Sequence, residues 1–187
     1  MNEKESDNGP DYWYVLRDMK RPNAKDSGFK ALLKRVELKG RLFIPFKQKI
    51  YCEFGKHVRY EIPFYQDLIF VGEELKKIAD ILEEIPALQF RYVKGKRAEA
   101  MKIRNDSMQY FIKAVAETEK VRYYSIDEVS PQLYGKNIRI IGGRLDGYEG
   151  RLMSKRGSKV KRLILDLKEC NLAAAIQVEP EYIQLVK

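Results

Sequence analysis

Basic side chains are the chemically active groups that this sequence concentrates most clearly. The chain carries a formal net charge of +9, and residues 136–162 alone hold nine basic and two acidic residues. Such a stretch attracts polyanions, and nucleic acid before other partners. A solvated surface that only keeps the chain in solution is the alternative that this excess of charge leaves open.

Phosphate contacts require only cationic side chains within reach, so the candidate nucleic-acid contacts are chosen by charge and position. In the first part of the chain they are Lys30, Lys34, Lys94, Lys96 and Arg97. In the second part they are Arg144, Lys155, Arg156, Lys159 and Lys161, with Arg139, Arg151 and Arg162 in the same basic stretch.

Residues that could support catalysis are few and badly spaced. His57 is the single histidine, and the adjacent Glu83 and Glu84 point to different faces of a helix. Neither a phosphate-binding loop nor a common hydrolase motif occurs. Cys52 and Cys170 are far apart without a CxxC pair, which suits a reducing cytoplasm and predicts buried, apolar roles. We expect a chain that is not an enzyme and that holds no metal or cofactor.

The first part of the chain alternates strand and helix patterns. Aromatic and β-branched residues predict strands, and apolar residues at i, i+3, i+4 and i+7 predict helices. One helix is expected to bury Phe29, Leu32, Leu33 and Val36, and the next is expected to follow the Leu75–Leu82 stripe. A projecting hairpin is expected from Gln48–Tyr51 and His57–Ile62. The predicted strands are Tyr12–Arg17, Arg41–Pro45, Leu68–Val71 and Leu88–Val93, and a third helix begins near Asn105.

The second part of the chain shows only short strand patterns. They are Asn137–Ile141, Tyr148–Lys155, Arg162–Leu167, Leu172–Val178 and Ile183–Val186. Glycines at 142, 143, 147 and 150 predict a tight turn between the first two. Alanines 173–175 favour helix locally, but the flanking strand patterns predict a barrel. The expected fold class is α+β: an antiparallel sheet with helices, followed by a small five-stranded β-barrel.

This change of pattern predicts the domain organisation. We expect a flexible polar tail at 1–11, a first domain at 12–124, a linker at 125–134 and a second domain at 135–187. No apolar run approaches the roughly 18 residues of a membrane helix, and the tail has no secretory signal. The expected chain is a cytoplasmic monomer.

Several segments together resemble the NusG family of transcription factors. The glycine-spaced stretch Asn137–Leu152 resembles the KOW motif, and Trp13-Tyr14-Val15 resembles the opening strand of the family's N-terminal (NGN) domain. Further similar segments are Leu42–Pro45, Phe64–Val71, Ile85-Pro86 and Ile103–Ile112. The ending Ala173–Val186 resembles the specialised UpxY-type paralogues, which act on particular long operons, notably for capsular polysaccharide.

The resemblance implies that the first domain binds the clamp helices of RNA polymerase and keeps elongation processive. The residues that it suggests as polymerase contacts are Trp13, Phe43, Phe46, Tyr65 and Leu68. It also implies contact with nascent RNA or non-template DNA. For the KOW domain it suggests the termination factor Rho or a small ribosomal-subunit protein as partner.

One departure from the family pattern affects the predicted polymerase site. Where the family usually has Pro-Gly-Tyr, this chain has Gln66-Asp67-Leu68, and Tyr65 is the nearest aromatic substitute. Two alternatives therefore stay open beside a specialised elongation and antitermination factor. The chain could be a KOW-type RNA-binding or ribosome-associated protein, or a general NusG acting at all genes.

Overall fold

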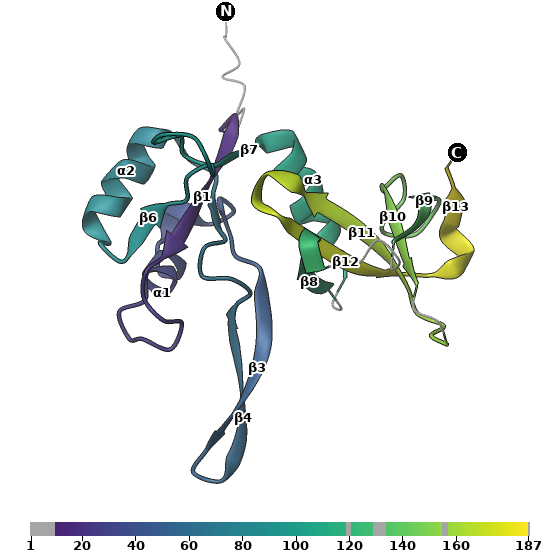
Figure 1. The fold of residues 1–187 in the computed structure, drawn as a ribbon, viewed down its shortest axis with the longest axis horizontal. Coiled ribbons are helices and arrows are strands. Elements are labelled where there is room, and N and C mark those ends of the chain that lie inside the picture. Colours follow the sequence, from purple (N-terminus) through teal and green to yellow (C-terminus); the bar gives the residue numbers. More distant parts are fainter. Residues whose placement is uncertain (1–9, 119–120, 129–133, 155–156, 187) are drawn as a thin grey trace, which may run out of the picture. The chain divides into compact units, whose positions relative to one another are not determined.

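The computed structural model describes residues 10–118, 121–128, 134–154 and 157–186. The chain divides into two compact units, Met1–Asp106 and Ser107–Lys187 (Figure 1). The domains expected from the sequence, 12–124 and 135–187 with a linker at 125–134, remain a prediction. In the described part of the chain, no helix combines the length and the apolar character that crossing a membrane requires.

The sheet of the first unit forms around β1 (Tyr12–Asp18), which pairs antiparallel with its neighbours. The strand order is β2 (Leu42–Phe43), β5 (Ile69–Val71), β1 and β6 (Leu88–Phe90), and β7 (Lys102–Arg104) pairs with the first half of β1. The side chains of β1 are apolar on both faces, which is what a strand covered on both sides requires. β1 is therefore the central strand.

Two helices share one apolar core with this sheet. α1 (Gly28–Leu33) contributes Leu32, and α2 (Leu75–Glu84) contributes Ile78 to the cluster that contains Leu16 of β1. The predicted α1 stripe was too long, because Leu33 and Val36 are 54% and 81% exposed. The helix ends at Leu33, and the following 3-10 turn η1 (Val36–Leu38) buries Leu38 in the same core instead.

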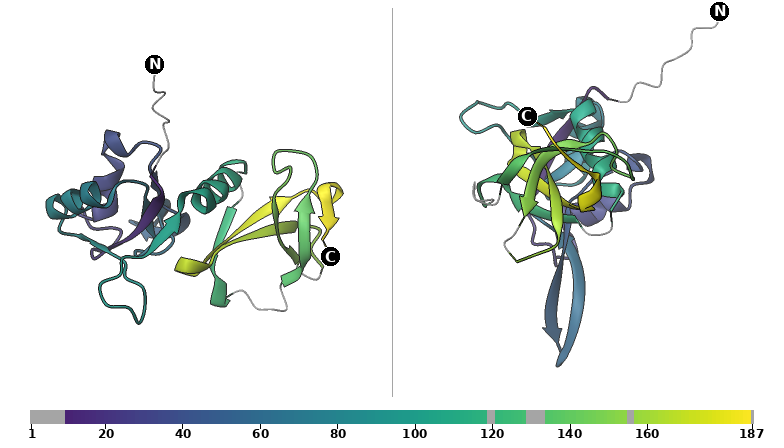
Figure 2. Two further views of the ribbon diagram at one scale, coloured as in Figure 1. Left: turned by 90° about the horizontal axis from the view of Figure 1, so that it is seen from above. Right: turned by 90° about the vertical axis from the view of Figure 1, so that its right-hand side faces the viewer.

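The predicted hairpin is confirmed and is longer than expected. β3 (Phe46–Glu53) and β4 (Lys56–Pro63) pair along eight residues each and form a two-stranded sheet of their own. Figures 1 and 2 show this hairpin extending away from the sheet and helices of the first unit. Both faces of its outer part are consequently open to solvent.

The second unit contains most of α3 (Asn105–Ala116) and a six-stranded antiparallel sheet. Its strand order is β13-β9-β10-β11-β12-β8. The bounds are β8 Val121–Ser125, β9 Tyr134–Ile140, β10 Glu149–Ser154, β11 Lys161–Leu167, β12 Leu172–Val178 and β13 Ile183–Leu185. Three short 3-10 turns, η2 Ile126–Glu128, η4 Lys168–Cys170 and η5 Pro180–Tyr182, connect them.

The prediction of a closed five-stranded barrel is corrected by these pairings. The five expected strands are present, but β8 adds a sixth, and the pairings of the described residues do not close the sheet between β13 and β8. β8 was overlooked because residues 121–125 lie between the predicted third helix and the predicted linker. Five register pairs along β12 hold it there.

β12 shows how tertiary pairing decides the state of a locally ambiguous segment. Ala173, Ala174 and Ala175 are fully buried and pair with β11 on one side and β8 on the other. Pairing on both edges satisfies the backbone and outweighs the helix preference of alanine, which is a weak local bias. The predicted strand over Leu172–Val178 is confirmed.

Candidate interaction surfaces

Two of the five predicted polymerase contacts lie in the interior. Trp13 and Leu68 are each 1% exposed. The indole Nε1 of Trp13 donates to Asn105 Oδ1 at 2.8 Å, and the ring covers Gly72, where a Cβ would lie 2.7 Å from Trp13 Cε2. In this structure these side chains support the sheet rather than offer surface, and their contact with polymerase stays a prediction.

The other three predicted contacts are half-buried aromatic residues of the same unit. Phe43 lies 5.9 Å from Phe70 between ring centroids, and Phe46 lies 6.3 Å from Phe29. Tyr65 lies 4.4 Å from its neighbour Phe64. One side of each ring is therefore packed against the fold, and the remaining part is accessible.

The segment after β4 is held against the entry to β3. The backbone N–H of Phe64 donates to Pro45 O at 2.7 Å, and Lys47 Nζ lies 5.1 Å from the Phe64 ring centroid and 5.9 Å from that of Tyr65. A cation over an aromatic face is an attractive arrangement, worth about 0.5–1 kcal/mol at exposed sites. These contacts form an aromatic corner (Phe64, Tyr65) with Lys47 at its rim.

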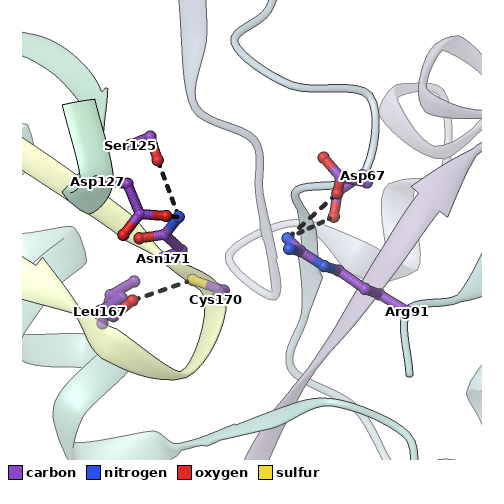
Figure 3. Close-up of polar contacts among 7 residues, drawn as sticks. All are labelled: Asp67, Arg91, Ser125, Asp127, Leu167, Cys170 and Asn171. Carbon is purple, nitrogen blue, oxygen red and sulfur yellow. Dashed lines mark hydrogen bonds and ion pairs between the residues drawn. The ribbon is translucent and has the colours of Figure 1, made fainter. Parts of the chain in front are cut away.

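The unusual turn at Gln66 and Asp67 has a structural role. Gln66 donates its side-chain amide to Lys20 O, and its carbonyl accepts from the N–H of Asp18 at 2.7 Å. Arg91 Nη1 lies 3.4 Å from both the carbonyl oxygen and Oδ2 of Asp67 (Figure 3). These contacts fix the connection between β4 and β5 although the Pro-Gly-Tyr of the family pattern is missing.

The predicted basic contacts of the first unit fall into two groups. Lys30 is half-buried, and its Nζ donates to Ala24 O at 2.9 Å, whereas Lys34 is exposed. Lys94, Lys96 and Arg97 are exposed in the connection between β6 and β7, where Lys96 forms an ion pair with Glu99 at 3.0 Å. The structure therefore does not gather the five into one patch by direct contact.

The predicted basic residues of the second unit are also divided by their partners. Arg139 is paired with Glu149, and Arg151 with Asp166. Arg144 and Lys159 are exposed and Lys161 is half-buried, and none of the three has an ion-pair partner among the described residues. Lys155 and Arg156 lie outside the described residues.

The glycine-spaced turn is shaped by an aromatic ring. Gly142 and Gly143 have φ angles of +93° and +70°, and a Cβ on either would lie 3.2 Å from the ring of Tyr182. A pocket of about 270 Å³ lies beside this turn and includes Arg144, Glu179 and Tyr182 in its lining. The glycines thus serve the fold by permitting positive φ and close packing.

The two cysteines differ in solvent exposure, which the sequence did not indicate. Cys170 is buried as predicted, and its Sγ donates to Leu167 O at 3.5 Å (Figure 3). Cys52 is exposed, which corrects the prediction of a buried role, and it stands opposite His57 in the hairpin register. Two such side chains remain short of the three or four ligands of a protein zinc site.

Ionic contacts at the start of α2 tie the helix to the sheet. The carboxylate of Glu73 accepts from Arg41 Nη1 at 2.5 Å and from Lys77 Nζ at 3.3 Å. Burial raises the pKa of Glu73, but the hydrogen bonds and charges of Arg41 and Lys77 outweigh it, so the net pKa lies below its ordinary value. Glu73 is therefore charged at neutral pH.

Sequence reasoning missed the side chains on the outer part of the β3–β4 hairpin. Lys49, Tyr51, Phe54 and Tyr60 were not chosen as candidates, although three of them are aromatic and exposed or half-buried. The alternation of the two strands carries the signal, but it is readable only when the register across the turn is known.

Comparisons with known proteins find similarity at the level of solved structures. A scan against protein-family models and a search of curated proteins find no match. The chain is similar to a solved structure that describes domain interaction in Thermotoga maritima NusG, with 10% identity, coverage of 94% of this chain and 97% of that chain, and a TM-score of 0.46. At this identity and score, the likeness does not assign an activity to this chain.

Proposed function

We propose that this chain is a non-enzymatic transcription elongation and antitermination factor that binds RNA polymerase through its first unit. In this role it raises processivity on particular long operons, such as those for polysaccharide biosynthesis, as the UpxY-type paralogues of NusG do. It acts in the cytoplasm, as a monomer, on the clamp helices of the polymerase.

One observation carries this proposal. The three segments that resemble the NusG N-terminal domain most directly, Trp13–Val15, Leu42–Pro45 and Phe64–Val71, supply three neighbouring strands in the order β2-β5-β1. Segments far apart in sequence thus meet in one sheet, beside the aromatic corner. Aromatic residues enclosed by a polar rim are typical of protein–protein interfaces.

The nucleic-acid and KOW-domain roles follow from the same proposal. The exposed lysines and arginines of both units supply contacts for nascent RNA or non-template DNA phosphates. In the second unit, Arg144, Lys159 and Lys161 offer charge to RNA or to a protein partner such as Rho or a small ribosomal-subunit protein.

Binding of the full chain to purified RNA polymerase tests the proposal. We expect complex formation at moderate salt, and we expect Tyr65→Ala to weaken it by about fivefold or more, as truncation of an aromatic interface residue does. Tyr92→Ala is the matched control, because Tyr92 is 50% exposed in the same unit but lies outside the aromatic corner. Absence of binding by the unmodified chain would refute the proposal.

A second candidate is an RNA-binding protein that acts without polymerase. Arg144, Lys159 and Lys161 of the second unit favour it, because none of them has an ion-pair partner in the part of the chain that the structure describes. It predicts strongly salt-dependent binding of the full chain to structured RNA, with the affinity reduced when these three residues are changed to glutamine. Under this candidate, Tyr65→Ala leaves RNA binding unchanged and polymerase binding is not observed.

A further inference from the structure

The outer part of the β3–β4 hairpin has two chemically different faces. Residues paired across an antiparallel ladder lie on the same face, and successive pairs alternate. One face therefore carries the pairs Lys47–Ile62, Lys49–Tyr60, Tyr51–Val58 and Glu53–Lys56, which we name the lysine–tyrosine face. The opposite face carries Gln48–Glu61, Ile50–Arg59 and Cys52–His57.

The lysine–tyrosine face interleaves aromatic rings with cations. The rings of Tyr51 and Tyr60 meet edge to face with their centroids 5.6 Å apart, and Lys49 Nζ lies 4.9 Å from the Tyr51 centroid. Lys47, on the same face, lies one pair closer to the body of the unit, and Lys56 lies near the tip. The face thus has three lysines and one glutamate in its register set.

The turn at the tip of this hairpin contains a residue that is unfavourable there, Phe54. Phe54 and Gly55 form the two-residue loop with φ angles of +49° and +77°, the pattern of a type I′ turn. Such turns favour asparagine or aspartate before the glycine, and positive φ is unfavourable for a bulky residue. The Phe54 side chain is fully exposed, at 104%, so it gains no packing that would offset the strain. A strained, fully exposed aromatic residue at a tip indicates a role outside the fold.

We propose that the lysine–tyrosine face and Phe54 bind single-stranded nucleic acid. Bases that are not paired stack on Tyr51, Tyr60 and Phe54, and the neighbouring lysines contact the phosphates. Sequence-tolerant binding of single strands uses this combination of aromatic platforms and cations. A duplex keeps its bases stacked within the helix and offers the rings no face to stack on. This site uses none of the basic residues proposed above, and it operates without polymerase.

The test measures binding of the full chain to fluorescein-labelled oligothymidylate by fluorescence anisotropy, with no polymerase present. Failure here is therefore separate from failure of the polymerase proposal. We expect saturable binding at low salt that weakens as salt rises, and weaker binding to a duplex of the same length. Equal affinity for duplex and single strand, or no binding to the oligothymidylate, overturns the proposal.

Two charge variants on the same hairpin separate the two faces. Lys49→Gln and Arg59→Gln each remove one positive charge, but Lys49 lies on the lysine–tyrosine face and Arg59 on the opposite face. We expect Lys49→Gln to reduce affinity for the oligothymidylate several-fold and Arg59→Gln to change it by less than twofold. Equal effects of the two variants contradict a face-specific site and leave only general electrostatic attraction.

Aromatic variants test stacking with a built-in control for folding. Phe54→Asn installs the residue that a type I′ turn favours, so loss of binding cannot be attributed to a disrupted hairpin. We expect Phe54→Asn and Tyr60→Ala each to weaken binding about fivefold or more, the effect of losing one base stack. Ile50→Ala, on the opposite face, serves as the matched control and should bind normally. If both aromatic variants bind the oligothymidylate normally but lose affinity for a protein partner such as polymerase, the hairpin is a protein-docking arm and the proposal is wrong.

Discussion

At the scale of single residues, the indole ring of Trp13 determines that position 72 is a glycine. The indole of Trp13 lies so close that an added Cβ would approach Cε2 to 2.7 Å, a separation at which one of the two groups has to shift. The ring itself is held by the hydrogen bond to Asn105 and is 1% exposed. The space above Gly72 is therefore filled by a side chain that cannot easily move.

We predict that Gly72→Ala lowers the free energy of unfolding by about 1–3 kcal/mol, the usual cost of overpacking a core. Urea denaturation followed by far-UV circular dichroism measures this change, because Trp13 is the single tryptophan and a fluorescence readout would be lost when it is replaced. In a Trp13→Phe background, where the ring is smaller, the same substitution should cost less. Equal costs in the two backgrounds would show that the ring is not the cause.

Glu73 allows a prediction about pH. Because its pKa is lowered in the folded chain, Glu73 stabilises the fold above the unfolded pKa, and this contribution is lost as pH falls through the lower folded pKa. Glu73→Gln should therefore cost about 1–2 kcal/mol near neutral pH and progressively less below about pH 4. Urea titrations at several pH values measure the difference from the unmodified chain.

Glu74→Gln provides the control for that measurement. Glu74 is the exposed neighbouring carboxylate, and its side chain makes no capping hydrogen bond to α2. Its substitution should change stability by less than about 0.5 kcal/mol at any of these pH values. A Glu73→Gln cost that is independent of pH would contradict the ionic account of this contact.

At the scale of elements, Asn171 links the edge strand β8 to its neighbour β12 in the sheet of the second unit. Its backbone has φ of +59°, and its Nδ2 donates to Ser125 Oγ at 2.9 Å and to Asp127 Oδ2 at 2.7 Å (Figure 3). Its carbonyl accepts from the N–H of Ile126 at 3.1 Å. The side chain thereby fixes the end of β8 to the start of β12.

We predict that Asn171→Ala costs about 2 kcal/mol of unfolding free energy, because it removes both side-chain hydrogen bonds and because alanine adopts positive φ less readily than asparagine. Asn171→Gly should cost less, since glycine accepts the same backbone conformation. Amide hydrogen exchange should show the loss of protection centred on Val121–Ser125. Unchanged exchange in this strand would contradict the linking role.

Much of the element order could be predicted from the sequence because alternation and apolar stripes are local signals. The hairpin, the central strand and β12 are examples. The exposure of Cys52 could not be predicted, because its position opposite His57 depends on a register set by a Phe-Gly turn that is not a usual hairpin signal. β8 was missed because its strand state depends on the edge of β12, which is a non-local contact. Burial of Trp13 and Leu68 likewise depends on the packing of the whole unit.

At the scale of the whole molecule, the net charge and the surfaces of the two units suit contact with both protein and nucleic acid. A chain with a net charge of +9 combines an aromatic corner and a projecting hairpin in one unit with cations in the other that lack ion-pair partners among the described residues. An elongation factor that contacts both a protein and nucleic acid requires surfaces of both kinds. These surfaces support the proposal that the chain acts on a transcribing polymerase.

Single-round transcription on a long template with purified RNA polymerase is the decisive experiment for this proposal. We expect the unmodified chain to increase the fraction of transcripts that reach the end of the template, Tyr65→Ala to reduce this gain and Tyr92→Ala to preserve it. An unchanged transcript distribution, at chain concentrations well above those of the polymerase, would rule out a role in elongation.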